Sequence, residues 1–276
     1  YITIEEFRKN VGLPVNGEIL TKEIMVEKFP KYFKMSKSYF IGQSYFVKQA
    51  SSKKSHIFET YKGEARKTPL FEEHKKLTSR DLVPFAGWQM PVLYTSILDE
   101  HKAVRETAGL FDVTHMGVVE ISGQYASRYL DLIATNYITK MKVGQSQYSY
   151  LIDPDGKVID DIMVYKRGET KFMVIINASN AEKDIAWMNA VASKEVIIDK
   201  DFPDREIEVA PVIRDLKDPS SGKDRKVDIA LQGSRSLDIM KALAENNCCI
   251  KKRLEKLAKS TFIETEIEGM NLLVSR

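Results

Sequence analysis

The stretch Tyr148-Ser149-Tyr150-Leu151-Ile152-Asp153-Pro154-Asp155-Gly156-Lys157-Val158-Ile159-Asp160-Asp161 decides the fold of this 276-residue chain. Its middle, Asp153-Pro154-Asp155-Gly156, has strong turn chemistry, because proline presets φ and glycine tolerates the left-handed conformation. The flanking residues, 148–152 and 157–165, have the pattern of β-strands. We therefore predict a β-hairpin at this point.

Helical and extended patterns alternate on both sides of this hairpin. Helices are predicted at 70–77, at 96–108 with Gly109 ending the helix, at 125–133, around Ile185, Met188 and Val191, and at 234–244. Strands are predicted at 117–121, 172–176, 229–231 and 270–274. Ser179-Asn180-Ala181-Glu182 has the pattern of a capping box at the start of a helix. Alternation with hairpins favours an α+β fold over a doubly wound sheet.

Composition divides the chain into three zones. Residues 1–50 mix helical and extended patterns, and residues 51–67 are polar and typical of a linker or long surface loop. The regular α+β pattern occupies residues 68–276. With 43% hydrophobic residues, the chain can bury a substantial core.

Charge and composition narrow the function classes. A net charge of +3 is too small to indicate nucleic-acid binding, and no apolar run reaches the roughly 20 residues of a membrane span. The four histidines are scattered and show no metal-ligand spacing. The adjacent Cys248 and Cys249 are expected to be ordinary thiols, which fits a cytoplasmic location, and an organelle matrix fits equally well.

Asp160-Asp161 is the most informative polar pair. Successive residues of a strand point to opposite faces, so one carboxylate faces inward if the other faces water. An inward carboxylate needs donors, which could be a bound heterocycle or backbone amides. The alternative is a strand end at which both carboxylates are solvated, and the sequence leaves both readings open.

A series of motifs follows in order from Lys67 onward: Thr68-Pro69-Leu70, Glu73-His74, 83–92, Glu100-His101, 104–106, 108–117, Thr135-Asn136, Gly144-Gln145, 156–161, 174–177, 180–184 and 230–233. With these motifs the chain resembles the front half of the glycine-cleavage aminomethyltransferase (T-protein) family. Residues 5–43 are similar to a later part of the same family, although a plain N-terminal extension is the alternative. Family members continue beyond the match at Val274-Ser275-Arg276, so we expect this chain alone to lack part of the pocket and to be inactive by itself.

This resemblance implies a fold, a cofactor and a partner. The family has a three-domain clover-leaf arrangement, here represented by its front part with ferredoxin-like α+β units and β-hairpins, and tetrahydrofolate lies in a central channel. Its members take the aminomethyl group from the lipoylated H-protein of the glycine cleavage system and release ammonia. A folate-dependent demethylase acting on a sulfonium or methoxy donor, and a non-catalytic folate-binding protein, share the scaffold and remain alternatives.

The resemblance also implies site residues. Met116 would pack on the pterin, with core packing as the alternative. Asp153 falls where the family usually has an asparagine that bonds the pterin edge, with a turn role as the alternative. Asp161 and Tyr148 complete the expected cofactor-binding set. Tyr137 stands where the family has a catalytic aspartate, and a phenol, mostly protonated at neutral pH, can donate or stack but cannot replace a carboxylate.

Overall fold

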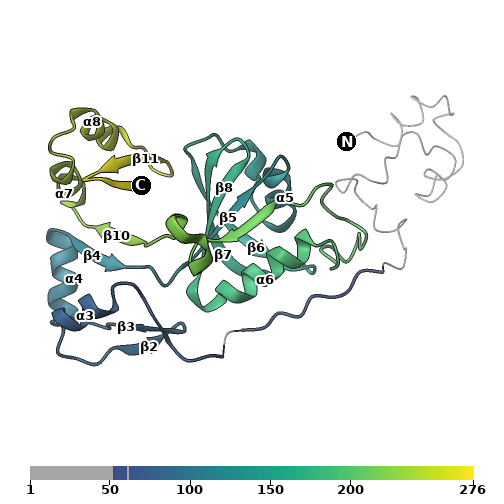
Figure 1. Ribbon diagram of the computed structural model, residues 1–276, viewed down its shortest axis with the longest axis horizontal. Coiled ribbons are helices and arrows are strands. Elements are labelled where there is room, and N and C mark those ends of the chain that lie inside the picture. Colours follow the sequence, from purple (N-terminus) through teal and green to yellow (C-terminus); the bar gives the residue numbers. More distant parts are fainter. Residues whose placement is uncertain (1–51, 61) are drawn as a thin grey trace, which may run out of the picture. The chain divides into compact units, whose positions relative to one another are not determined.

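A five-stranded antiparallel sheet forms the centre of this computed structural model, which describes residues 52–60 and 62–276 (Figure 1). The strand order is β6-β7-β8-β5-β9. Its strands are β5 (Gly117–Ser122), β6 (Ser146–Ile152), β7 (Val158–Gly168), β8 (Lys171–Ile176) and β9 (Val212–Asp215), and each adjacent pair is antiparallel. The segment 5–43, similar to a later part of the family, lies outside the described residues.

The predicted hairpin is confirmed. It joins β6 to β7, and Gly156 sits in its turn with φ of +76°, a conformation that glycine adopts without a Cβ penalty. The Gly156 N–H donates to the Asp153 carbonyl at 2.9 Å and closes the turn. Asp153 at the start and Gly156 at the end of the turn therefore act as the sequence indicated.

Two helices supply the main core of the sheet. The helices are α5 (Ala126–Ile133) and α6 (Ala181–Ala192), and their buried residues pack with those of the strands in one cluster. In α5 the buried positions are Ala126, Tyr129, Leu130 and Ile133, at the i, i+3, i+4, i+7 spacing of one helical face. Gly117 allows close packing here, because a Cβ on it would lie 2.5 Å from Ile176 Cγ1. This arrangement confirms the α+β class.

The capping-box interpretation is wrong. The chain enters α6 through a 3-10 turn, η4 (Ala178–Asn180), and the residue at the N-cap is Asn180 rather than Ser179. The Asn180 side chain makes no cap hydrogen bond. Its Oδ1, the atom that would accept a cap N–H, accepts from the Lys183 ammonium at 2.9 Å, and its amide nitrogen donates to Asp160 Oδ1 at 2.7 Å. A tertiary contact with β7 thus replaces the local cap.

The second face of the sheet meets the C-terminal hairpin. Val118, Met173 and Leu216 are buried there against Leu273 of β12. This hairpin pairs β11 (Phe262–Ile267) with β12 (Met270–Ser275), and α7 (Ser236–Leu243) and α8 (Cys248–Lys256) lie beside it. Cys248 and Cys249 are free and exposed, as expected.

The remaining elements lie outside the central sheet. They are β1 (Arg66–Lys67), α3 (Phe71–Leu77), β2 (Val83–Phe85), β3 (Trp88–Met90), α4 (Ile97–Glu106), β4 (Gly109–Asp112), η3 (Ile138–Lys140), η5 (Pro219–Asp224) and β10 (Ile229–Gln232). Ser96 is the N-cap of helix α4, and its side chain accepts a hydrogen bond from the Asp99 N–H. The helix ends at Glu106, and Gly109, which was predicted to end it, is the first residue of β4. Strand β4 pairs with β10.

Residues 52–60 lie along the domain. Lys54 forms a parallel bridge with Val196, and its N–H donates to the Glu195 carbonyl at 2.8 Å. The Phe58 ring packs on the main core at 5.4 Å from the Trp187 ring. The described part of the polar segment therefore contacts α6 and the loop that follows it.

Candidate functional site

Four residues form a row across one end of the central sheet. Tyr150 of β6 pairs directly with Asp161 of β7. The β7–β8 register, continued two residues beyond Met163–Ile175, places Asp161 opposite Asn177. The β5–β8 register, continued one residue beyond Gly117–Ile176, places Met116 opposite Asn177. Segments far apart in the sequence thus converge at this edge.

The outward face of this row carries tyrosines beside a carboxylate. Asp161, Tyr148 and Tyr150 are exposed, while the alternate residues Asp160 and Ile162 point into the helical core. The Tyr148 and Tyr150 rings meet edge to face at 5.3 Å. A hydrogen bond with Tyr150, partial burial and the neighbouring Asp161 carboxylate raise the pKa of the Tyr148 phenol. The Tyr148 phenol therefore stays protonated at neutral pH, next to the Asp161 carboxylate.

Tyr137 lies next to β6. Residues 134–137 run antiparallel to this strand, with Ala134 bridging Leu151 and the Thr135 N–H donating to the Tyr150 carbonyl at 3.0 Å. The Asn136 amide donates to the Tyr148 carbonyl at 2.5 Å. The Tyr137 side chain is 55% exposed, and the Lys140 ammonium lies over its ring, 5.0 Å from the ring centroid, in a cation–π contact. The structure thus brings Tyr137 to the strand that carries Tyr148.

Asp153 is held by its own turn. Its Oδ1 accepts the Asp155 N–H at 2.8 Å and the Lys157 N–H at 2.9 Å. These contacts match the turn role that the sequence offered as the plain alternative. Contact with a ligand edge would have to use the other carboxylate oxygen, so that role stays a prediction.

Met116 is half-buried just before β5, and its N–H donates to the Val113 carbonyl at 3.0 Å. Its position at the end of the row places a polarizable apolar side chain at the opposite side of the sheet end from Tyr150. Core packing and ligand contact are both compatible with this partial exposure.

The structure resolves the Asp160-Asp161 alternatives. Asp160 is the inward carboxylate, 4% exposed, and Asp161 faces outward. The donors to Asp160 belong to the protein: the Asn177 N–H and amide, both at 2.9 Å, and the Asn180 amide at 2.7 Å. The reading in which both carboxylates are solvated is wrong, and no bound heterocycle is needed to satisfy Asp160.

Asp184 is a buried acid that the sequence interpretation missed. It lies on α6 facing Asp160, is fully buried, and neither of its oxygens has a hydrogen-bond donor among the described residues. Burial raises the pKa of Asp184 to about 9, with the Asp160 carboxylate contributing and Lys183 opposing. Helical spacing could have revealed it, because Asp184 precedes the buried Trp187, Met188 and Val191 by three, four and seven residues.

Asp160 keeps its charge beside this acid. Burial raises the pKa of the Asp160 carboxyl, but hydrogen bonds from Asp184, Asn177 and Asn180 outweigh it and hold that pKa below the ordinary value. Two adjacent buried carboxyl groups cannot both ionise at low cost. Asp184 therefore carries the proton at neutral pH.

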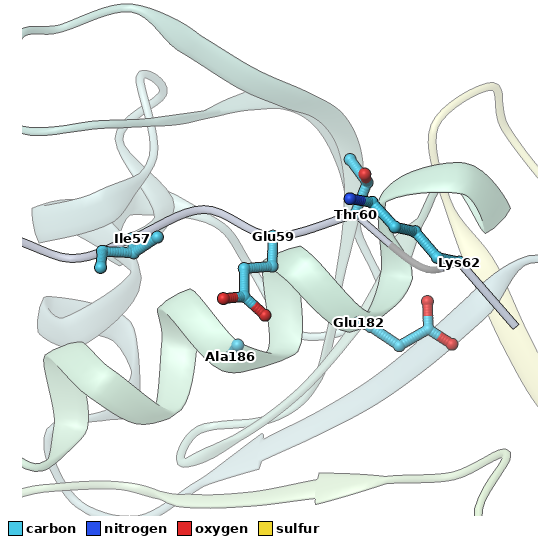
Figure 2. Close-up of a pocket in the computed structure, with 6 residues that line it drawn as sticks. All are labelled: Ile57, Glu59, Thr60, Lys62, Glu182 and Ala186. Atoms are coloured by element: carbon cyan, nitrogen blue, oxygen red, sulfur yellow. The ribbon is translucent and has the colours of Figure 1, made fainter.

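A pocket of about 380 Å³ lies away from this row, between α6 and the segment that carries Ile57, Glu59, Thr60 and Lys62 (Figure 2). Its lining consists of Ile57, Glu59, Thr60, Lys62, Glu182 and Ala186. It contains none of the site residues expected from the sequence. In the described part of the chain, no helix is long and apolar enough to cross a membrane, and no three His, Cys, Asp or Glu side chains gather as metal ligands.

An antiparallel sheet with two helices on one face, and with tyrosines, a carboxylate and a methionine at one end, defines an α+β domain. The family model described as the GCVT N-terminal domain matches residues 70–276. The chain therefore belongs to the GCVT N-terminal domain family, that of the glycine-cleavage T-protein.

Similar proteins agree with this assignment. An aminomethyltransferase from Halothermothrix orenii is 38% identical over 76% of this chain and 51% of its own length. One from Bacillus subtilis is 35% identical over 76% of this chain and 51% of its own length. The crystal structure of glycine cleavage system aminomethyltransferase T from Bartonella henselae matches with a TM-score of 0.58 and 27% identity, over 74% of this chain and 48% of that chain. This chain thus spans about half the length of such relatives, and the neighbour confirms the expected T-protein-like fold.

Proposed function

We propose that the protein acts as a tetrahydrofolate-dependent aminomethyltransferase of the glycine cleavage system. In this role it takes the aminomethyl group from lipoylated H-protein, transfers it to tetrahydrofolate and releases ammonia. The observation that carries the proposal is the match of residues 70–276 to the GCVT N-terminal domain family, whose similar proteins are named aminomethyltransferase. A compartment that keeps Cys248 and Cys249 reduced, such as the cytoplasm, suits this assignment.

The residues at the sheet end fit a reduced pterin. A carboxylate has lone pairs for several donors, so Asp161 can accept ligand N–H groups while it also accepts the Asn177 amide. The exposed rings of Tyr148 and Tyr150 offer contact area for a planar heterocycle, and Met116 offers an adaptable apolar contact. Much of such a reaction is positioning, which these groups can support without titrating themselves.

The decisive experiment combines the full-length gene product, aminomethyl-loaded H-protein and tetrahydrofolate, and measures ammonia. We expect ammonia and 5,10-methylenetetrahydrofolate in amounts that depend on the enzyme. H-protein without its lipoyl group is the matched control and should give neither product. Ammonia release no greater than in that control would remove the aminomethyltransferase assignment.

One observation favours keeping a second candidate. Tyr137 is exposed at the family's aspartate position, so no carboxylate is available there. A folate-dependent demethylase acting on a sulfonium or methoxy donor would form 5-methyltetrahydrofolate without H-protein, and the mass of the product separates the two reactions. A folate-binding protein without catalysis would bind tetrahydrofolate in calorimetry and turn over neither donor.

A further inference from the structure

A continuous chain of side chains leads from the core to the proposed folate-binding face. It begins at Asp184 on α6, which is fully buried and interacts electrostatically with Asp160 on β7. Asp160 Oδ1 accepts the Asn177 amide at 2.9 Å. The same amide nitrogen donates to Asp161 Oδ1 at 2.9 Å and to the Asp161 carbonyl at 3.1 Å. Asn177 is therefore shared between the buried and the exposed carboxylate.

The direction of these hydrogen bonds follows from the chemistry of the groups. Asp160 has three N–H donors and Asp184 has none among the described residues, so the proton of the pair belongs on Asp184. A protonated Asp184 donates to Asp160, which keeps Asp160 fixed as an acceptor for Asn177. With its nitrogen held in this way, Asn177 can present that amide to Asp161 in only one orientation.

We propose that Asn177, held by the buried Asp160–Asp184 pair, is a positioning residue that sets the orientation of Asp161 toward the ligand. This inference rests on the proposed folate function for its ligand but not for its geometry. Loss of the Asp184 proton would place two charges side by side in the core, and the pair would then have to separate. That separation pulls on Asn177 and releases Asp161.

Among the four side chains from Asp184 to Asp161, Asp184 is the one that we expect to respond to pH. Asp160 faces it from β7, and Lys183 on its own helix is the other charged group acting on it. Lys183 is held elsewhere, donating to the Ile159 carbonyl at 3.0 Å and to Asn180 Oδ1 at 2.9 Å. Because the Lys183 ammonium already donates to those partners, the main effect of ionising Asp184 is electrostatic repulsion with the Asp160 carboxylate.

The test records the NMR resonances of the Asp161 and Asp184 carboxyl carbons in the isotope-labelled full chain as the pH is raised. The titration runs from about pH 6 to about pH 10, a range in which a raised carboxyl pKa can be observed. The Asp161 resonance should shift with the same midpoint as that of Asp184. This shared midpoint should vanish in Asp184→Asn and in Asn177→Ala. It should persist in Asn189→Ala, a matched control whose amide bonds only the Ile185 carbonyl of its own helix. An Asp161 resonance that ignores Asp184 in the wild-type chain overturns the proposal.

Tetrahydrofolate titrations under anaerobic conditions separate this inference from the proposed function. Asn177→Ala should weaken binding about tenfold, as expected for one lost hydrogen bond to a charged group, and Asn189→Ala should leave it unchanged. Linked resonances without folate binding would support the positioning role and reject the folate function. Folate binding that is equal in wild type and Asn177→Ala would reject the positioning role and keep the function.

Discussion

Replacing Asp184 with asparagine should stabilise the protein, and the gain should grow with pH. The side chain is fully buried, and its pKa is raised to about 9 from an ordinary value of 3.8. Between pH 3.8 and about 9, the folded state holds a proton on Asp184 that the unfolded state lacks. The stability of the wild-type protein therefore falls as the pH rises through this interval. Asparagine keeps the shape and can still donate to Asp160, but it does not titrate.

The magnitude follows from the linkage slope. Each pH unit between the two pKa values costs the wild-type protein about 1.4 kcal/mol that the variant does not lose. From pH 5.5 to 7.5, well inside the interval, the advantage of Asp184→Asn should therefore grow by about 2.7 kcal/mol. The pKa of Asp160 is lowered, so its own titration lies below this window and adds no slope.

Urea unfolding of both proteins at several pH values measures this difference, since other titrating groups are shared and cancel. The exposed Asp201 provides a control: Asp201→Asn should show a difference from wild type that stays flat with pH. If the Asp184→Asn advantage is equally flat between pH 5.5 and 7.5, Asp184 is ionised in the folded protein and the shared-proton account is wrong.

Three further substitutions test other parts of the structure. Gly117→Ala should destabilise by about 1–3 kcal/mol, because its Cβ would lie 2.5 Å from Ile176 Cγ1, whereas Gly168→Ala, with its nearest contact at 3.6 Å, should be close to neutral in the same thermal unfolding assay. Tyr129→Phe should cost about 1–2 kcal/mol in urea unfolding, because the buried hydroxyl donates to a backbone carbonyl of α6 at 2.7 Å, and an unchanged midpoint would contradict this hydrogen bond. Tyr137→Asp should raise the rate of ammonia release by supplying a carboxylate beside β6, and a rate at or below wild type would show that this position does not limit transfer.

The sequence predicted those parts of the fold that depend on neighbouring residues, such as a turn or the alternation of side chains along a strand. The turn at Asp153–Gly156 fixes its own hairpin. The two-residue period of a strand gave opposite faces for Asp160 and Asp161 as one of two readings, and the structure agrees with that one. The short strands β1, β2 and β3 escaped prediction because two or three residues carry no periodicity. Their pairing is decided by tertiary contacts.

The candidate site shows the same division. The residues expected from the family resemblance lie on or beside the strands that form the sheet end, but the side chains that organise them were not predicted. Asn177 donates to two carboxylates on another strand, and Asn180, at the N-cap of α6, makes no cap hydrogen bond but donates to Asp160. Such contacts depend on which strand becomes a neighbour, which a single sequence does not state.

Negative charge at this site rests on few groups. Of the carboxylates expected from the sequence, Asp153 is engaged by the N–H groups of its own turn, and the position of the family's aspartate carries the phenol of Tyr137. Under the proposed function, Asp161 is then the carboxylate that would meet ligand N–H donors, and the Asn177 amide already donates to it. An exposed acid supported in this way loses little side-chain entropy on binding, because its orientation is already fixed. Under the proposed function, the buried neutral acid Asp184 helps to hold Asn177 and, through it, the orientation of Asp161.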